Sequence, residues 1–189
     1  MGNREDLLAG ARQAILERGL AKVTARDIAG AAGVSLAAIG YHFGTKDRLV
    51  AEAIAEATGN EIGEGMRRAI LDAGEGRSLA QSLEATWNGM VDVIQSHQDE
   101  LTLSFESGVG TARSTESQAF MSEATAEVYA ALSGPLREVH PELSEDDAHA
   151  VAKVYFALFQ GIALQWLVAP AGEQLTGADV VRAVRAMGR

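Results

Sequence analysis

The 189-residue chain contains no cysteine, which excludes disulfide bonds and thiolate-ligated metal sites and is compatible with a reducing compartment. Proline is scarce as well, since the chain has only three, at positions 135, 141 and 170. Aromatic residues make up 5% of the chain, whereas alanine and glycine are abundant, and this composition favours closely packed helices over β-sheets. We therefore predict an all-α fold.

A long hydrophobic run is also missing from the sequence. The N-terminal residues M-G-N-R-E-D-L-L include no apolar stretch of the kind that a signal peptide requires. The longest apolar stretch, residues 154–169, is interrupted by Gln160 and Gln165 and falls short of the ~20 residues that a membrane span needs. We expect a cytoplasmic protein that does not interact with a membrane.

Positive charge is in deficit, and the deficit is uneven along the chain. The net charge is −10, yet residues 1–50 hold seven Lys and Arg against five acids, whereas the remainder holds nine against twenty-one. An acidic rear part would repel DNA from the wrong face of a weakly basic head. An acidic surface that only aids solubility is the alternative.

One stretch, residues 24–48, carries dense signals for helix ends. Thr24 can cap a first helix by accepting a hydrogen bond from the N–H of Asp27, and Gly33 can end that helix in the left-handed conformation. Ser35 can cap a second, shorter helix that Gly44 closes, and a third helix follows. Two short helices joined by a tight turn have the layout of a helix-turn-helix, whose second helix can enter a DNA major groove.

Apolar residues at helical spacing define the inner faces of this head. Residues 4–18 form an amphipathic helix that would cover the helix-turn-helix from behind; its predicted inner residues are Leu7, Leu8, Ala11, Ile15 and Leu16. In the second short helix, Ile39 and Phe43 lie four apart and are predicted to face inward. The outer face of that helix would then carry Leu36, Ala37, Gly40 and Tyr41.

The string T-A-R-D-I-A-x-A-A-G-V-S followed by Y-H-F-G-T-K-D-R-L resembles the N-terminal domain of TetR-family transcriptional regulators. The resemblance covers roughly residues 8–50. It implies a helix-turn-helix DNA-binding domain over residues 1–50 and a helical ligand-binding and dimerisation domain over residues 51–189. It further implies a homodimeric repressor that binds a palindromic operator in double-stranded DNA and is released by a small-molecule effector, although the sequence leaves activation open.

The resemblance and the physical chemistry indicate the same DNA contacts. Residues at the family's backbone-contact positions are Thr24, Ser35, Tyr41, His42 and Lys46, and Arg26 is placed for neighbouring phosphates. Lys46 lies in the first turn of a helix, where N–H groups already attract phosphate, so its charge suggests an external anion. Packing for Tyr41, a helix-end role for His42 and a capping role for Thr24 are the alternatives.

The expected base-reading residues are small and apolar. Leu36, Ala37 and Ala38 offer no hydrogen bonds but can contact thymine methyl groups and allow the helix to approach closely. Gly40 stands where the family commonly has an aromatic residue, and Tyr41 beside it can compensate. We therefore expect specificity to depend on methyl contacts and DNA shape.

Capping signals and apolar stripes predict the helices behind the head. We expect a helix from 46 that is irregular over 57–77, with a loop at 73–77, and a loop at 108–114. The remaining helices are expected over 78–97, 98–107, 115 to before Pro141, 144–168 and 176–187. Ser78 with Gln81, Thr115 with Gln118, Ser144 with Asp147 and Thr176 with Asp179 supply the caps.

The helix over 144–168 is apolar on nearly every side from Val151 to Val168. A helix without a polar face must be buried all round, and so small a domain can cover only one side of it. We expect the other side to meet a second copy, giving a homodimer through helices at about 145–169 and 176–187, as the resemblance also implies. A wholly intramolecular central helix is the alternative.

An apolar effector cavity between helices is expected in the rear domain. Its candidate lining residues, for each of which plain core is the alternative, are Trp87, Met90, Phe105, Met121 and Phe156. Glu106 and His97 are possible polar anchors. The four histidines have no metal-site spacing and the chain has no phosphate loop or nucleophile motif, so we expect no enzyme, metal or cofactor. A head that binds protein instead of DNA is a further alternative.

Overall fold

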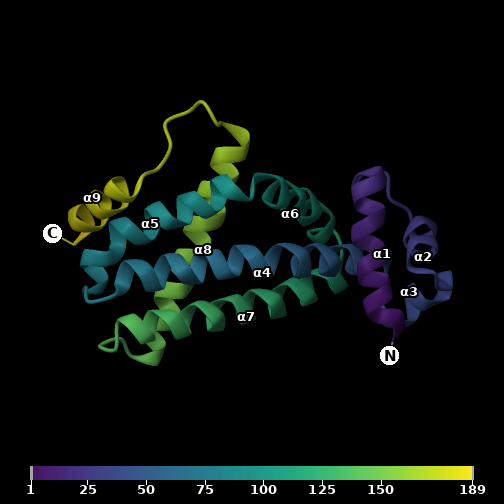
Figure 1. Ribbon diagram of the computed structural model, residues 1–189, viewed down its shortest axis with the longest axis horizontal. Helices are drawn as coiled ribbons and strands as arrows, with labels where there is room; N and C mark the ends of the chain where they lie inside the picture. Colours follow the sequence, from purple (N-terminus) through teal and green to yellow (C-terminus); the bar gives the residue numbers. More distant parts are fainter. Residues whose placement is uncertain (1, 189) are drawn as a thin grey trace. The chain divides into compact units, whose positions relative to one another are not determined.

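The computed structural model describes residues 2–188, apart from the side chains at positions 2, 3 and 109, and all the regular secondary structure in that range is α-helical. The prediction of an all-α fold is confirmed. The described helices are α1 (Gly2–Arg18), α2 (Ala25–Ala32), α3 (Leu36–Phe43), α4 (Lys46–Gly74), α5 (Leu79–Ser96), α6 (Gln98–Thr111), α7 (Thr115–Val139), α8 (Glu145–Val168) and α9 (Gly177–Met187) (Figure 1).

The chain folds into two compact units. Unit 1 consists of residues 1–60 and 102–124, and unit 2 consists of residues 61–101 and 125–189. Helices α4, α6 and α7 therefore each contribute a segment to both units. The division into a DNA-binding part, 1–50, and a ligand-binding part, 51–189, concerns function and stays a prediction.

Unit 1 has its core where α1 packs across α2 and α3. The buried residues include those predicted for the inner faces of α1 and α3: Leu7, Leu8, Ala11, Ile15, Ile39 and Phe43. A Cβ at Gly10 would lie 2.7 Å from the Ala32 nitrogen, so the glycine permits the close contact between α1 and α2. The prediction for Leu16 is wrong, since its side chain is 86% exposed. The reason is helical geometry, because Leu16 lies ~100° around the helix from buried Ile15.

Unit 2 is built around α5. Trp87, Met90 and Ile94 on this helix are fully buried, together with Met66 and Ile70 from the unit 2 segment of α4. Both α8 and α9 pack against α5, and in Figure 1 the olive-yellow α9 runs alongside it. The contact with α9 is close at its first residue, where the N–H of Gly177 donates to Asn88 Oδ1 at 3.2 Å.

Three predicted helix boundaries are wrong. Helix α4 is continuous to Gly74, and the glycine at 65 serves packing, because a Cβ there would lie 2.8 Å from the Val93 side chain. Helix α6 continues to Thr111, so most of the expected loop at 108–114 is helical. Helix α7 begins at Thr115, so the residue that caps it is Ser114 and not the expected Thr115. The hydroxyl of Ser114 accepts a hydrogen bond from the N–H of Ser117 at 3.3 Å.

Helix α8 is longer than the apolar stretch recognised in the sequence. It is the one described helix whose length and mean hydropathy, 1.4 over an 18-residue window, would allow it to cross a membrane. The core helix of a soluble protein can have the same composition, and α8 begins with Glu145, Asp146 and Asp147. Length and composition therefore do not by themselves assign α8 to a membrane.

Candidate nucleic-acid interface

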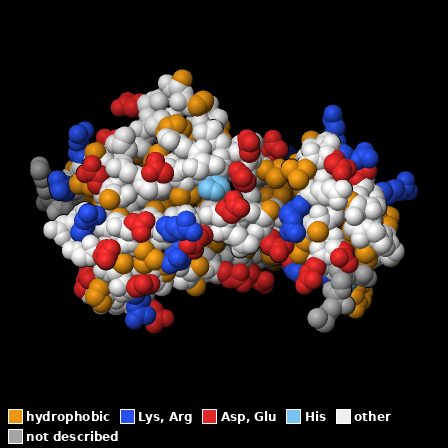
Figure 2. Space-filling model, in the orientation of Figure 1, with side chains coloured by type: hydrophobic (Ala, Val, Ile, Leu, Met, Phe, Trp, Pro, Cys, Tyr) orange, Lys and Arg blue, Asp and Glu red, His pale blue; other side chains and the backbone are white. Residues whose placement is uncertain are grey.

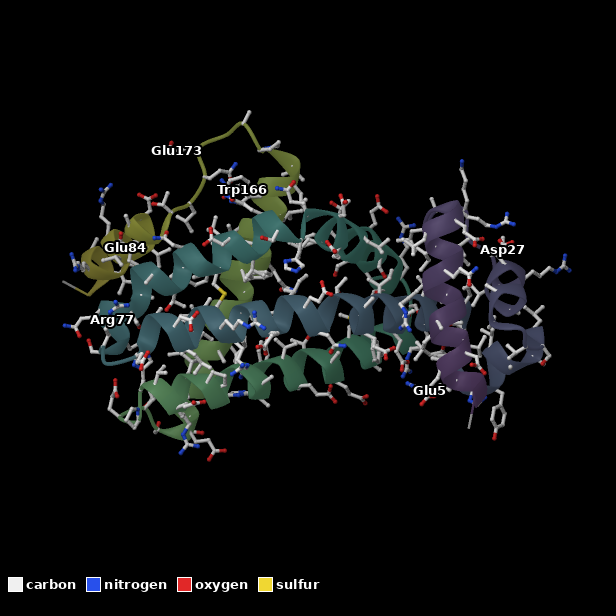
Figure 3. The ribbon with its side chains drawn as sticks, in the orientation of Figure 1. Glu5, Asp27, Arg77, Glu84, Trp166 and Glu173 are labelled. Carbon is white, nitrogen blue, oxygen red and sulfur yellow. The ribbon has the colours of Figure 1, made fainter. Side chains whose placement is uncertain are left out.

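Helix α2 begins with a complete capping box. Thr24 Oγ1 accepts a hydrogen bond from the N–H of Asp27 at 3.3 Å, and Asp27 Oδ2 accepts from the Thr24 N–H at 3.0 Å and from its hydroxyl at 2.6 Å. These hydrogen bonds, with a smaller contribution from Arg18, lower the pKa of Asp27 from its usual value of 3.8. Figure 3 labels Asp27 beside the start of α2. The Thr24 side chain therefore serves first as a cap.

The turn between α2 and α3 depends on a left-handed glycine. Gly33 has φ of 66° and ψ of 25°, a conformation that glycine adopts without steric cost. Its N–H donates to Gly30 O at 3.2 Å, and the N–H of Val34 donates to Ala29 O at 3.1 Å. The predicted end of the first short helix is confirmed, and this turn sets the direction in which α3 leaves.

Ser35 is the N-cap residue of α3, as expected, but it does not use its side chain for capping. Its backbone is extended, with φ of −71° and ψ of 149°, and the hydroxyl makes no capping hydrogen bond within the described helix end. The side chain is exposed. Ser35 Oγ is consequently positioned to donate to an external acceptor at the start of α3.

The outer face of α3 is small and apolar. Tyr41 is 86% exposed and Leu36 is 47% exposed, and Ala37 and Gly40 lie on the same open face. No described atom lies within 4 Å of the position that a Cβ at Gly40 would occupy. Ala38, expected among the base-reading residues, is buried instead, because it lies next to Ile39 on the inner side of α3. The face is therefore formed by Leu36, Ala37, Gly40 and Tyr41.

The polar candidates His42, Lys46 and Arg26 lie at the end of α3, at the start of α4 and on α2. His42 is half-buried, with its ring edge-on to Tyr41 at 4.9 Å between ring centres. Lys46 Nζ donates to the carbonyl of Val23 at 3.3 Å and lies 3.6 Å from Asp47 Oδ1. Arg26 is exposed on α2. The Lys46 contact shows that this cation already has partners within unit 1, so its position does not require an external anion.

The predicted effector residues do not form one cluster within a unit. Trp87 and Met90 are buried in unit 2, where Phe156 is half-buried against Tyr129, with 5.9 Å between ring centres. Phe105 and Met121 belong to unit 1. His97, a suggested polar anchor, contacts the carbonyl of Val93 through Nδ1 at 2.9 Å and ends α5.

Sequence reasoning missed an apolar groove of about 390 Å³ in unit 2. It lies among α5, α8 and α9, and Trp87 and Tyr155 meet in it edge-on at 5.2 Å. Neither the Trp87 N–H nor the Tyr155 hydroxyl has a hydrogen-bond partner among the described residues, and burial raises the pKa of Tyr155 to about 12. The groove is lined by Leu79, Ala80, Leu83, Trp87, Ala150, Val151, Val154, Tyr155, Leu158, Val180 and Val184. The signal available in the sequence was the spacing of Val151, Val154 and Leu158, which places three apolar side chains of α8 on the side that lines the groove.

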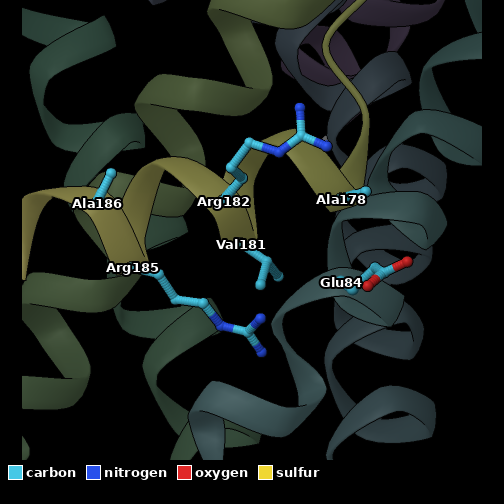
Figure 4. A pocket seen from close by; sticks show the side chains of 6 residues that line it. All are labelled: Glu84, Ala178, Val181, Arg182, Arg185 and Ala186. Carbon is cyan, nitrogen blue, oxygen red and sulfur yellow. The ribbon is translucent and has the colours of Figure 1, made fainter.

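A second hollow of about 460 Å³ lies between α5 and α9, and charged and aliphatic side chains line it together. Figure 4 shows Glu84 on α5 and Arg185 on α9 at opposite sides of it, with Arg182 nearer the start of α9. Its cations are exposed, and Figure 2 likewise shows acidic and basic side chains intermixed over the visible surface. No group of three potential metal ligands occurs among the described residues.

Residues 7–53 match the sequence model of a protein family described as bacterial regulatory proteins, tetR family. This match covers most of α1, all of α2 and α3, and the start of α4. No curated protein matches the chain.

Solved structures share the fold along nearly the whole chain. A transcriptional regulator from Rhodococcus sp. Rha1 is 22% identical, with a TM-score of 0.54 over 97% of this chain and 92% of that one. The multidrug binding protein EbrR complexed with proflavin is 18% identical, with a TM-score of 0.63 over 98% of this chain and 99% of its own. The same protein complexed with imidazole is 19% identical, with a TM-score of 0.61 over 97% and 88%. At such identities the likeness establishes the fold.

Proposed function

The chain belongs through its N-terminal domain to the TetR family of DNA-binding transcriptional regulators, and from that premise we propose that it is a homodimeric repressor. It binds a palindromic operator in double-stranded DNA, acts in the cytoplasm and is released by a small-molecule effector. The observation that carries the proposal is the projecting face of α3, with Tyr41 almost fully exposed beside three small or aliphatic residues.

This face has the properties of a major-groove reader. A helix with Ala37 and Gly40 outward can approach base edges closely, and Leu36 can contact thymine methyl groups. Phosphate contacts supply most of the affinity, and Thr24, Arg26, Ser35, Tyr41, His42 and Lys46 are the residues proposed for them. A tyrosine that is 86% exposed is better explained by a partner such as DNA than by core packing.

Dimerisation is supported by an apolar seam on α8. Six exposed residues follow one another at steps of four and three: Ala150, Val154, Ala157, Gly161, Leu164 and Val168. Such 4-3 spacing is the pattern by which one helix packs into another, and small residues let the two backbones approach. On α9, Val184 and Met187 are exposed as well. The opposite side of α8 is buried in unit 2, so lipid need not cover the helix.

A second copy is favoured over a membrane as the partner of the seam. The seam follows one side of α8, whereas Ala152, Tyr155 and Phe159 on the other side are covered by protein. A helix in lipid would expose apolar residues all round, except where it meets other spanning helices. The acidic first turn of α8 also disfavours burial in hydrocarbon.

An apolar effector fits the groove in unit 2, which shares Ala150, Val154 and Val184 with the proposed dimer surface. Its volume of about 390 Å³ lies within the range of small-molecule sites, and Trp87 is common to the groove and to the residues expected from the sequence. The structurally similar protein EbrR is complexed with proflavin, which makes an aromatic ligand a reasonable first class to test. Met90 and Phe156 of unit 2, and Phe105 and Met121 of unit 1, remain proposed effector contacts that do not line this groove.

The test of the proposal is DNA selection followed by measured affinity. Duplexes selected from a random library should converge on a palindrome, and the purified protein should bind it at least ~10³-fold more tightly than random duplex at physiological salt. Equal affinity for selected and random duplexes would support the alternative in which the head binds protein. A reporter gene behind the selected operator then distinguishes repression from activation.

A further inference from the structure

The first turns of α7 contact the junction between α3 and α4 within unit 1. The carboxylate of Glu116 lies 3.5 Å from the position that a Cβ on Gly44 would occupy, and Gly44 is the residue that ends α3. One turn along α7, the ring of Phe120 lies under the guanidinium of Arg48, 4.9 Å from the ring centre. Glu116 and Phe120, four residues apart on α7, thus lie against Gly44 and Arg48, which are four residues apart at the junction of α3 and α4.

Arg48 belongs to an ion-pair network that extends to the core of the head. Its Nε lies 3.4 Å from Oε2 of Glu52, whose side chain is almost completely buried. Glu52 also pairs with Arg4 of α1, and the Arg4 guanidinium lies over the ring of Phe43 at 5.4 Å. Phe43 is the last residue of α3. A continuous set of contacts therefore connects Phe120 with the end of the reading helix.

The orientation of Arg48 is not fixed by hydrogen bonds alone. Its Nε is buried, and although the ion-pair distance to Glu52 is short, no described group accepts a well-directed hydrogen bond from this atom. A planar guanidinium stacked on a ring keeps its orientation through the ring face. Phe120 is consequently the side chain that holds the Arg48 plane in place above Glu52.

We propose that Phe120 is a positioning residue for DNA recognition. It acts through Arg48 on the packing of the C-terminal end of α3. The inference rests on the proposed function, because it assigns α7 a part in operator binding by the same head. Phe120 touches no DNA in this account; its ring sets how Arg48 and Arg4 share the buried carboxylate of Glu52, and thereby how Phe43 anchors α3.

Two substitutions of Phe120, one that removes the aromatic ring and one that keeps it, test the proposal. Phe120→Leu keeps an apolar side chain but removes the aromatic face, and it should weaken operator binding by about 5-fold, the size of one lost, partly exposed cation–π contact. Phe120→Tyr retains the face and should bind within about 2-fold of the natural chain. Arg48→Lys, which keeps the charge without the planar group, should weaken binding in the same direction as Phe120→Leu. Ser122→Ala, on an exposed part of α7, is the matched control.

Amide hydrogen exchange separates positioning from general destabilisation. In Phe120→Leu, amides of residues 36–43 should exchange faster while those of α5 keep their rates. The proposal is overturned if Phe120→Leu binds the operator as the natural chain does, if Phe120→Tyr loses as much affinity as Phe120→Leu, or if exchange accelerates equally in α3 and α5. If the natural chain itself selects no operator, the proposed function has failed, and this outcome is distinct from a failure of the role of Phe120.

Discussion

Lys46, in the first turn of α4, donates a hydrogen bond from Nζ to the carbonyl oxygen of Val23, 3.3 Å away, in the residue before the N-cap of α2. This bond connects the start of the helix-turn-helix with the residues that follow it. A lysine held in this way has lost part of its freedom before it meets DNA, so it reaches a phosphate at a smaller entropic cost. Lys46 therefore has a structural partner and a place at the proposed interface.

The first prediction concerns this lysine. Lys46→Gln should weaken binding about equally for operator and random duplex, because a phosphate contact carries no sequence information, and should reduce the slope of log affinity against log salt by about 1. Binding measured by fluorescence anisotropy over a salt series checks this. Lys153→Gln, an exposed lysine on α8, is the control and should leave the slope unchanged. An unchanged slope for Lys46→Gln would remove this residue from the phosphate contacts.

The second prediction concerns the seam on α8. Gly161 is exposed, and no described atom lies within 4 Å of the position of an added Cβ, so a leucine there is tolerated in the single chain. At a close helix crossing the same side chain would separate two copies, and Gly161→Leu should shift the protein from dimer to monomer. Sedimentation velocity measures the change. Gly134→Leu, at an equally open helical glycine on α7, should remain dimeric.

The third prediction concerns the capping box of α2. Hydrogen bonds from Thr24 lower the pKa of Asp27, so its stabilising contribution is complete above the unfolded value of 3.8 and is lost as pH falls further through the folded value. Thr24→Ala should be less stable than the natural chain by about 1 kcal/mol at pH 7. That difference should shrink below about pH 4. Urea unfolding over a series of falling pH values measures it, and a difference that stays constant through the acid titration of Asp27 would contradict the assignment.

The fourth prediction concerns Tyr155 at the floor of the groove. Burial disfavours the charged phenolate and raises the pKa of Tyr155 to about 12, so the stability associated with the neutral phenol is present below the unfolded value of 10.0 and is lost as pH rises toward 12. Absorbance at an alkaline series of pH values should show a late-titrating tyrosine. Tyr155→Phe should remove that phase, whereas Tyr41→Phe should leave it in place.

The fifth prediction concerns the effector class. The lining of the groove contains no charged side chain among its described residues, so a neutral apolar aromatic ligand should bind there and a cation such as proflavin should bind poorly. In a Trp166→Phe variant, N-phenyl-1-naphthylamine should quench the fluorescence of Trp87. Leu83→Lys should abolish that quenching. Strong quenching by proflavin together with none by the neutral probe would contradict this view of the groove.

Local chemistry explains which parts of the fold the sequence predicts well. The capping boxes at Thr24, Ser78 and Thr176 are confirmed, because each depends on a hydroxyl and an acceptor three residues apart. The exposure of Tyr41 and Leu36 follows from the same short-range periodicity. Ser35 shows the limit of this reasoning, since a good capping residue in the right place leaves its side chain free of the described helix end.

Long-range packing explains what the sequence does not predict. Gly65 resembles a helix breaker in the sequence, yet it lies inside α4 because Val93 fills the space where a side chain would be. The groove depends on α9 packing against α5, and the contact between Phe120 and Arg48 joins residues 72 positions apart. Such contacts leave no periodic pattern, so only the folded chain reveals them.

In the proposed complex, two copies of α3 read one DNA site together. Hydroxyl-radical footprinting on a selected operator tests this directly. We expect two symmetric protected segments whose centres are ~34 Å apart along the helix axis, or a multiple of that distance. Both segments should be lost with Gly161→Leu at protein concentrations that saturate the natural dimer. A single protected segment, or a footprint that the monomeric variant reproduces in full, would contradict the account.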